Sequence, residues 1–450
     1  MSAIRDRACV RAFVYVFLLA SLWFGCTAIK ASAATVPAGF YGVNLGGSLM
    51  NDAASRPAAF KVMRAGGLSE VRTDALWSDI EPAPPVAGVH TFAWAKYDSF
   101  VTDLASNGMR WYPTLGYSTP WAASVAGEMF SPPARDADFA TYVAAFAKRY
   151  GSDGTFWASH PELPKLPTTV YGIWNEPSNP HFWHGAQATP ARYMRLYLAA
   201  RTAIKSADPG ASVATAGLLD SGVINANEYL RAMLGSTPAA RNQIDLVGWH
   251  PYVGGLDAIL ASVKRARTTL NQYGLGTVPI AISEVGWHTG FTSAQRAEWL
   301  RGLAAELPHA ELNVTRLLPY VWTGDPMWQI TNPDGSLGQI GSAYFAGMRE
   351  AFAPQPQKRS KSKQCTTKKR KAVKKTANSS KKSKAAKKKA NSSKRSKAAK
   401  RCVKKTTSKA AKRKARAAAK KRAIAAKKAK AAVKRAIAAE KARAARASAA

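Results

Sequence analysis

The feature that most constrains the fold is an alternation of short apolar runs with longer helical segments between Ala38 and Phe352. The runs are rich in β-branched and aromatic residues, which favour strands. There are eight of them: Phe40–Gly47, Glu70–Trp77, Arg110–Tyr117, Val170–Pro177, Ser212–Leu219, Leu246–Tyr252, Ile280–Trp287 and Leu317–Gly324. The pattern therefore predicts eight strand–helix units in succession.

Residues typical of helix starts and ends support a helical structure for the segments between the runs. We expect Asp136 to cap a helix that ends at Tyr150, before Gly151. The remaining signals define two more helices: Thr189-Pro190 opens Ala191–Ser206, and Ser293 caps Ala294–Leu307.

These units predict an α/β fold, a (β/α)8 TIM barrel over residues 38–353, since such barrels take about 250 residues plus insertions. The alternative is an open doubly wound sheet. It is disfavoured because Asn44-Leu45-Gly46-Gly47-Ser48, after the first run, lacks the G-x-G-x-x-G spacing of a phosphate-binding loop.

In a barrel, reactive groups collect at the C-terminal ends of the strands. Here those ends carry polar and aromatic residues, so we expect one functional rim. The residues are Asn44, Arg72, Asp74, Trp77, Tyr117, Asn175, Glu176, Asp220, His250, Tyr252, Glu284, Trp322 and Asp325. The longest segment between runs, Ser118–Thr168, is expected to wall the cleft.

Two glutamates dominate this rim. Glu176 and Glu284 each follow an apolar run, the fourth and the seventh. Two carboxyl groups in one cleft do not both ionise cheaply, so one stays protonated as an acid and the other ionised as a nucleophile. That pairing is what a retaining glycosidase needs. Arg72 is placed to hold the nucleophile ionised, and Asn175 to bind a sugar 2-hydroxyl.

The motifs around these residues resemble those of clan A glycoside hydrolases, over about residues 38–353. Tyr171–Pro177 (YGIWNEP) is similar to the fourth-strand acid/base motif, and Ile282–Trp287 (ISEVGW) to the seventh-strand nucleophile motif. Trp249–Tyr252 (WHPY) resembles the His-x-Tyr of the cellulase-type family 5, whose second-strand Arg and eighth-strand Trp match Arg72 and Trp322.

The resemblance implies roles for these residues. Glu176 is the acid/base and Glu284 the nucleophile. The supporting or sugar-binding residues are Arg72, Asn175, His250, Tyr252 and Trp322. Family 5 carries a His at the end of strand three, where this chain has Leu115-Gly116-Tyr117; that difference favours a family 39-like or unclassified relative.

Thirteen tryptophans add a weaker signal for a polysaccharide or oligosaccharide substrate, because sugar rings stack on indole. We expect Trp287 to contact substrate, although loop packing is the alternative for each tryptophan. His181 and His184 lack a third ligand, so no metal and no cofactor is predicted.

Charge is concentrated at the C-terminal end. Of the 66 lysines and arginines, 39 lie in residues 358–450, together with one acidic residue, Glu440. The tail, residues 354–450, has almost nothing to bury, so we expect disorder. Its Lys/Ala-rich composition resembles linker-histone tails. It is expected to bind polyanions such as cell-wall polymer, acidic exopolysaccharide or extracellular DNA, with a solubilising extension as the alternative.

The N-terminus has the features of a secretory signal peptide, residues 1–33. Three arginines precede the apolar stretch Ala12–Gly25, and Ala31-Ser32-Ala33 offers a cleavage site. The stretch is shorter than the ~20 residues of a spanning helix, so we expect cleavage and no transmembrane segment afterwards. The four cysteines, Cys9, Cys26, Cys365 and Cys402, all lie outside the predicted barrel, and the last two can pair within or between molecules.

Together these features predict a secreted retaining β-glycoside hydrolase that its tail tethers to an anionic surface. Two other classes remain open: an inactive barrel that acts as a carbohydrate-binding or scaffold protein, and a polyanion-binding protein dominated by its tail. The presence of both glutamates disfavours the first, and the barrel and signal are unexplained by the second.

Overall fold

A computed structural model describes residues 36–185 and 188–353 of the chain. The predicted signal peptide, the predicted cationic tail and all four cysteines lie outside these residues.

Parallel strands form the centre of the fold. Over the described residues there are nine, in two sheets with the chain orders β1-β2-β3-β4-β5 and β6-β7-β8-β9. The sheets join at both edges, because Thr215 N donates to Leu246 O at 2.9 Å and Leu317 N donates to Phe40 O at 2.8 Å. The result is a closed barrel with these strands: β1 (Gly42–Asn44), β2 (Glu70–Leu76), β3 (Arg110–Gly116), β4 (Val170–Ile173), β5 (Ser212–Thr215), β6 (Leu218–Asp220), β7 (Val247–Pro251), β8 (Ile280–Ile282) and β9 (Val314–Leu317).

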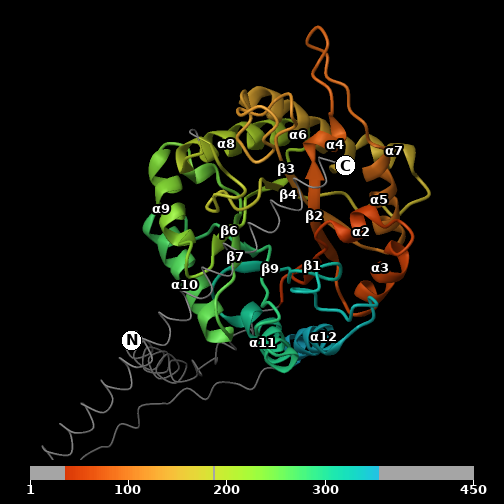
Figure 1. The fold of residues 1–450 in the computed structure, drawn as a ribbon, viewed down its shortest axis with the longest axis vertical. Helices are drawn as coiled ribbons and strands as arrows, with labels where there is room; N and C mark the ends of the chain where they lie inside the picture. The colour runs from red at the N-terminus through yellow and green to blue at the C-terminus, as the bar shows by residue number, and fades with distance from the viewer. Residues whose placement is uncertain (1–35, 186–187, 354–450) are drawn as a thin grey trace, which may run out of the picture. The chain divides into compact units, whose positions relative to one another are not determined.

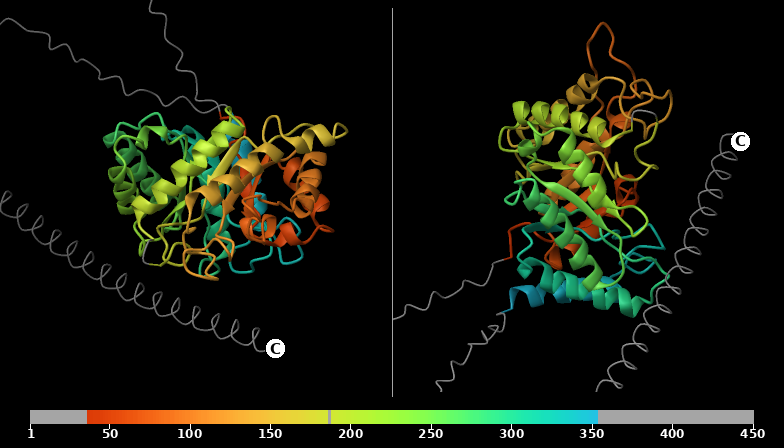
Figure 2. Two further views of the ribbon diagram at one scale, coloured as in Figure 1. Left: turned by 90° about the horizontal axis from the view of Figure 1, so that it is seen from above. Right: turned by 90° about the vertical axis from the view of Figure 1, so that its left-hand side faces the viewer.

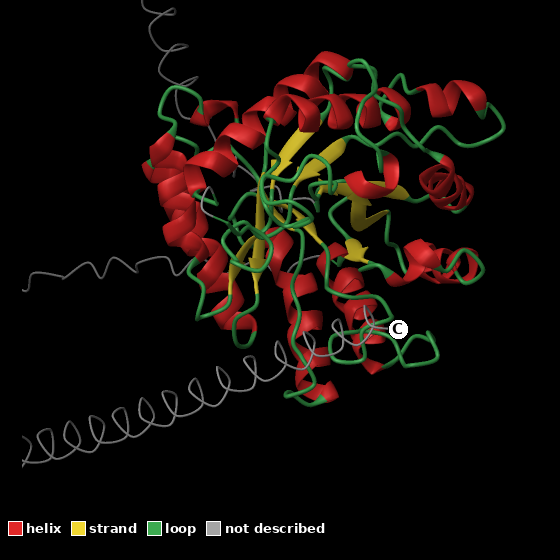
Figure 3. Ribbon diagram, turned by 45° about the horizontal axis from the view of Figure 1, so that its top comes forward, coloured by secondary structure: helices red, strands yellow, loops and turns green. Residues whose placement is uncertain are grey.

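Helices surround the strands (Figures 1 and 3). One long helix follows each barrel strand: α3 (Arg56–Ala65), α5 (Ala95–Ser106), α6 (Asp136–Tyr150), α8 (Pro190–Ala207), α9 (Ala226–Ser236), α10 (Leu256–Gln272), α11 (Ser293–Glu306) and α12 (Gln339–Phe352). Shorter turns of helix are α2 (Ser48–Asn51), α4 (Trp77–Ile80), α7 (Thr155–Ser159), η2 (Arg241–Gln243) and η3 (Leu307–His309). None of the described helices is long and apolar enough to cross a membrane.

The predicted (β/α)8 barrel is confirmed, with two differences in its strands. The fifth run, Ser212–Leu219, is split into β5 and β6 at Ala216-Gly217, so nine strand segments fill eight barrel positions. The last strand was placed too late, because β9 ends at Leu317, where the run Leu317–Gly324 was expected to begin. Pro319 has no amide hydrogen with which to continue the ladder.

Helix starts were predicted to within a few residues. Thr189 caps α8 as expected, its side chain accepting from Arg192 N at 3.1 Å. Asp136 does not cap α6, since it already lies in the first turn. For α11 the cap is Thr292 rather than Ser293, and Gln295 completes a capping box with it.

Alternation along the strands divides the buried apolar residues into two clusters. Residues such as Tyr171 and Val213 belong to the large cluster that includes the buried helix side chains. Their neighbours point the other way, and they form a small cluster that fits the barrel interior: Tyr112, Val170, Ala214, Leu246, Ala281 and Leu318. This packed interior closes the barrel below the rim, so a ligand can only sit at the strand ends.

A long loop between α4 and α5 projects away from the barrel (Figure 2). Val86 and Val89 near its tip are 79% and 67% exposed. No residue of this loop lines the cavity at the strand ends.

Candidate active site

A cavity of about 520 Å³ opens at the C-terminal ends of the strands. Most of the polar residues predicted for the rim line it. They are Asn44, Arg72, Asp74, Tyr117, Asn175, Glu176, Tyr252 and Glu284. The strands therefore bring together residues from the first to the seventh barrel position, as parallel strands with a common direction must.

Glu284, two residues beyond β8, receives donors from three other strands or strand ends. Arg72 Nη1 donates to its Oε1 at 2.5 Å, and Asn44 Nδ2 donates to the same oxygen at 3.2 Å. The Tyr252 hydroxyl donates to Oε2 at 2.7 Å. Only 8% of Glu284 is exposed, so these bonds stand in for the water that an ionised carboxylate would otherwise bind.

These neighbours favour the ionised form of Glu284. Burial by itself would raise the pKa of its carboxyl, but the charges of His250 and Arg72 and the hydrogen bonds from Tyr252 and Arg72 outweigh burial, and the pKa lies below its ordinary value. An ionised carboxylate that is largely buried and held in place by these donors is a competent nucleophile.

Glu176 lies three residues beyond β4 in a locally strained turn. Trp174 and Glu176 both have left-handed backbone angles, with φ of 68° and 41°. Such angles cost a non-glycine residue of order 1–3 kcal/mol and persist where the surroundings enforce them. Asn179 Nδ2 donates to Glu176 Oε2 at 3.0 Å from the same turn, and this bond helps to fix the carboxyl.

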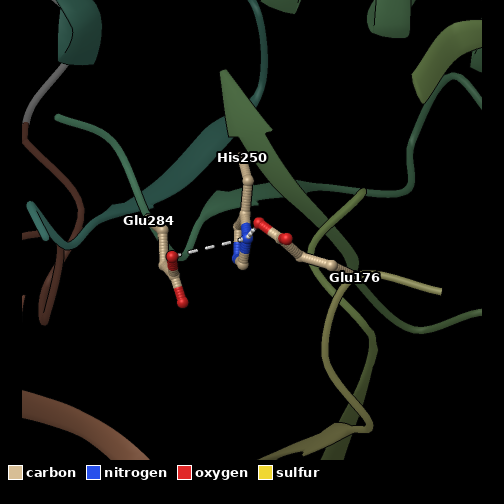
Figure 4. Close-up of side chains that lie close together, drawn as sticks. All are labelled: Glu176, His250 and Glu284. Atoms are coloured by element: carbon tan, nitrogen blue, oxygen red, sulfur yellow. Dashed lines mark hydrogen bonds and ion pairs between the residues drawn. The ribbon is translucent and has the colours of Figure 1, made fainter. Parts of the chain in front are cut away.

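His250 lies between the two glutamates (Figure 4). Its Nδ1 is 2.9 Å from Glu176 Oε1 and 3.7 Å from Glu284 Oε2. Its Nε2 is 2.9 Å from Ser283 Oγ, which fixes the orientation of the ring. One carboxylate oxygen of each glutamate and a His250 nitrogen all lie within 4.8 Å of one another.

The break between β5 and β6 makes room for this imidazole. A Cβ added at Gly217 would lie 1.8 Å from His250 Nε2, far inside van der Waals contact. Any larger residue at 217 would therefore push His250 away from both glutamates.

Arg72 also orders the neighbour of Glu176. Its Nη2 donates to Asn175 Oδ1 at 2.8 Å. The side-chain nitrogen of Asn175 is not needed for this bond and remains available to a ligand in the cavity, which Asn175 lines. One guanidinium thus contacts both Glu284 and the neighbour of Glu176.

Glu176, His250 and Glu284 are the one group among the described residues whose donor atoms could converge on a cation. Arg72, however, already donates to Glu284 at 2.5 Å, and a bound cation would lie beside its positive charge. The arrangement suits proton transfer and nucleophilic attack better than metal binding.

Several predicted positions need correction. Trp322 is 1% exposed, packs near Phe345 and lies outside the cavity lining, so it does not contact a sugar. It was misplaced because β9 ends five residues before it. His250, predicted to support the glutamates or to bind sugar, is fully buried and contacts both glutamates, which fits the supporting role. Trp77 is fully buried and donates to Glu81.

Two other rim residues also point away from the cavity. Asp220 is bound by Ser262 and Arg265, and Asp325 accepts from Met327 N. The segment Ser118–Thr168 does not wall the cleft, since it contains α6 and α7 and contributes no lining residue. Phe130 from this segment packs behind the lining residues Tyr117 and Phe182.

Trp328, one of the thirteen tryptophans weighed for contact with a sugar, lines the cavity from the loop after β9. Sequence reasoning missed Phe182 and Tyr320, which also line it. Asn179 and Ser283 were also missed, although each is within three residues of a predicted catalytic glutamate. A search for polar neighbours of Glu176 and Glu284 in the sequence would have found both.

A second cavity of about 260 Å³ adjoins the first. It shares Ser221, Tyr252 and Trp328 with the first cavity, and Trp287, His288 and Phe291 line the rest. Trp287 was predicted as a substrate-binding residue. The structure places it in this second cavity, where its Nε1 donates to Gly254 O at 2.5 Å.

No protein-family model and no curated protein sequence matches the chain, whereas many solved structures share its fold. A monomeric β-xylosidase from Caulobacter crescentus CB15 has a TM-score of 0.52 at 19% identity, over 70% of this chain and 69% of that one. The GH39 enzyme from Xanthomonas axonopodis pv. citri has a TM-score of 0.51 at 18% identity, over 70% and 67%.

A glucosidase from Croceicoccus marinus has a TM-score of 0.51 at 17% identity, covering 70% of this chain and 68% of that chain. At such identities the likeness concerns the fold alone. The predicted barrel, and the predicted resemblance to clan A glycoside hydrolases, are confirmed at that level.

Proposed function

We propose that this protein is a retaining glycoside hydrolase that cleaves β-linked oligosaccharides or polysaccharides. The observation that carries the proposal is the pair Glu176 and Glu284, with one oxygen of each within 4.8 Å of the other in a single cavity. Retaining enzymes hold their carboxyl groups ~5–5.5 Å apart, whereas inverting enzymes leave ~6.5–9.5 Å for a water. The short separation supports retention.

The first half of the reaction uses both glutamates. An oxygen of Glu284 attacks the anomeric carbon, the bond to the leaving oxygen breaks, and the proton of Glu176 passes to that oxygen. Arg72, Asn44 and Tyr252 keep Glu284 ionised and oriented before the attack.

The second half reverses the roles. Water attacks the anomeric carbon of the glycosyl–Glu284 ester, its proton passes to Glu176, and Glu284 leaves as a carboxylate. His250 Nδ1, 2.9 Å from Glu176 Oε1, can accept a hydrogen bond from the protonated carboxyl or donate one to the ionised carboxylate. It therefore accommodates both charge states of the acid/base.

The two cavities support the proposed substrate class. Asn175 presents its amide to the first cavity, where it suits a sugar 2-hydroxyl, a contact that strengthens in the transition state. The adjoining aromatic cavity with Trp287 and Trp328 offers ring faces for a second sugar unit. Two connected cavities favour a substrate of at least two sugars.

The test is digestion of a panel of β-linked oligosaccharides by the full chain, followed by NMR of the first anomer released. We expect the β-anomer from wild type and no product from Glu284→Gln. An initial α-anomer would show inversion, and equal release by both proteins would remove Glu284 from the chemistry.

We also propose that the protein is exported and held on an anionic matrix by its tail. The support for export is the predicted signal peptide of residues 1–33, and the support for retention is the segregation of charge, with 39 of 66 basic residues after Gln357. A chain shortened after Gln357 should keep its activity on a small glycoside and lose salt-sensitive retention on cells. Equal retention with and without the tail would contradict this proposal.

A further inference from the structure

Three charged residues of strand β2 point to the same side of the strand and follow one another along it. Glu70, Arg72 and Asp74 alternate with Val71 and Thr73, so they share a direction. Glu70 accepts from Arg316 at 2.9 Å, and Arg72 binds Glu284. Asp74 stands about 6.6 Å further along the strand, two residues beyond Arg72, and lines the first cavity.

The carboxylate of Asp74 has few hydrogen-bond partners among the described residues. The two terminal nitrogens of Arg72 already bind Glu284 and Asn175. Among the described residues none forms an ion pair with Asp74, and its side-chain partner is the Tyr117 hydroxyl. A carboxylate has about four acceptor sites, so several remain available to a ligand in the cavity that Asp74 lines.

Its surroundings make the ionised form of the Asp74 carboxyl unfavourable in the absence of a ligand. The pKa of Asp74 is raised to about 6: burial and the charge of Glu284 raise it, and the charges of Arg72 and His250 and the hydrogen bond from Tyr117 oppose the rise without cancelling it. The charged residues that line the cavity are therefore one arginine, already paired, and three carboxyl groups: Asp74, Glu176 and Glu284. Such a cavity suits a ligand that brings hydrogen-bond donors and no negative charge.

We propose that Asp74 is a specificity-determining residue, whose carboxylate accepts hydrogen bonds from the hydroxyls of the sugar bound beside Glu284 and excludes sugars that carry a carboxylate there. This inference rests on the proposed glycosidase function. It names the substrate class of the site as neutral sugars. The Asp74 carboxylate excludes the corresponding uronic acids by like-charge repulsion.

The experiment compares aryl β-glucosides with aryl β-glucuronides, and aryl β-galactosides with aryl β-galacturonides, on the full chain. Each pair differs only in a hydroxymethyl group against a carboxylate. Wild type should prefer the neutral member. Asp74→Asn should raise KM for the neutral glycoside about 10- to 100-fold, as expected for lost hydrogen bonds to a charged group, with a smaller change in kcat. Its preference for neutral over anionic substrate should fall at least about 10-fold.

Two further variants separate recognition from folding. Asp74→Glu keeps the charge and should keep the rejection of uronides even if KM changes. Asp257→Asn removes an exposed carboxylate from the first turn of α10 and should leave KM, kcat and preference unchanged. Thermal unfolding of all three variants shows whether each is folded.

The outcomes distinguish this inference from the function on which it rests. An unchanged KM and preference in Asp74→Asn, or a loss of kcat alone, would overturn the role of Asp74 and leave the glycosidase intact. Rejection of uronides lost in Asp74→Glu would do the same. Absence of hydrolysis of any neutral glycoside by wild type would overturn both.

Discussion

Glu284 and Glu176 share a cavity, yet they are held in opposite ways. Glu284 is bound by groups from distant parts of the chain: Asn44 at the end of β1, Arg72 in β2 and Tyr252 after β7. Glu176 is bound by Asn179 of its own turn and by His250, and among the described residues no arginine forms an ion pair with it.

The difference matches what the role proposed for each glutamate requires. A nucleophile must stay ionised until it attacks, and a permanent cation such as Arg72 provides that. An acid/base gains and loses a proton in every cycle, so a permanent cation would trap it in one state. A histidine, which can donate or accept, suits both states. Environment, rather than residue type, assigns the two roles.

The largest expected effect tests the nucleophile. Glu284→Ala should lower kcat by about 10⁴-fold or more, because no covalent intermediate can form. Added azide should restore turnover of an activated aryl β-glycoside and give the α-glycosyl azide, since a single displacement inverts. NMR of the product checks this, and a β-azide would reverse the assignment of the two glutamates.

Glu176→Ala sharpens the same comparison. We expect a loss of about 10²–10⁴-fold in kcat for substrates whose leaving group needs a proton, and a much smaller loss in the first step for activated aryl glycosides. Azide should here yield the β-glycosyl azide, since Glu284 still makes the intermediate. A loss independent of the leaving group would argue against an acid role.

Arg72→Met tests the permanent cation. Removing one partner of a buried ion pair costs about 3–5 kcal/mol, so kcat/KM should fall about 100-fold or more. Arg72 lowers the pKa of Glu284, so its loss raises that pKa and moves the acid limb of the pH profile to higher pH. Arg195→Met, an exposed change on α8, is the control and should leave the limb in place.

The smallest expected effects come from a matched pair of single donors. Tyr252→Phe removes one hydrogen bond from Glu284, and Asn179→Ala removes one from Glu176. Each should cost about 10-fold in kcat/KM. Only Tyr252→Phe should shift the acid limb upward, because the Tyr252 hydroxyl lowers the pKa of Glu284. Identical pH profiles for the two variants would mean that the environments are not distinct.

The sequence predicted the barrel and the main residues of the cavity because both depend on strand ends. Glu176, Glu284 and Arg72 follow or belong to runs whose periodicity is clear, and parallel strands bring their ends together without further information. The cavity then holds most of the predicted rim residues.

The residues that were misplaced depend on information that a local pattern does not carry. Trp322 and Trp328 lie in one loop, and only the end of β9 at Leu317 decides which faces the cavity. The burial of His250 depends on Gly217, a residue of another strand. Such pairings follow from three-dimensional packing, and no periodicity encodes them.

The interruption at Gly217 also limits how this site can change. The hydrogen-bond ladder of the barrel is interrupted there, and the interruption leaves space for the imidazole of His250 between the glutamates. Substitutions that alter substrate preference can accumulate in the loops, where Trp287 and Trp328 lie, without disturbing the reaction. Position 217 has no such freedom: in a library of variants selected for cleavage, it should be as invariant as the glutamates, although it contacts no sugar.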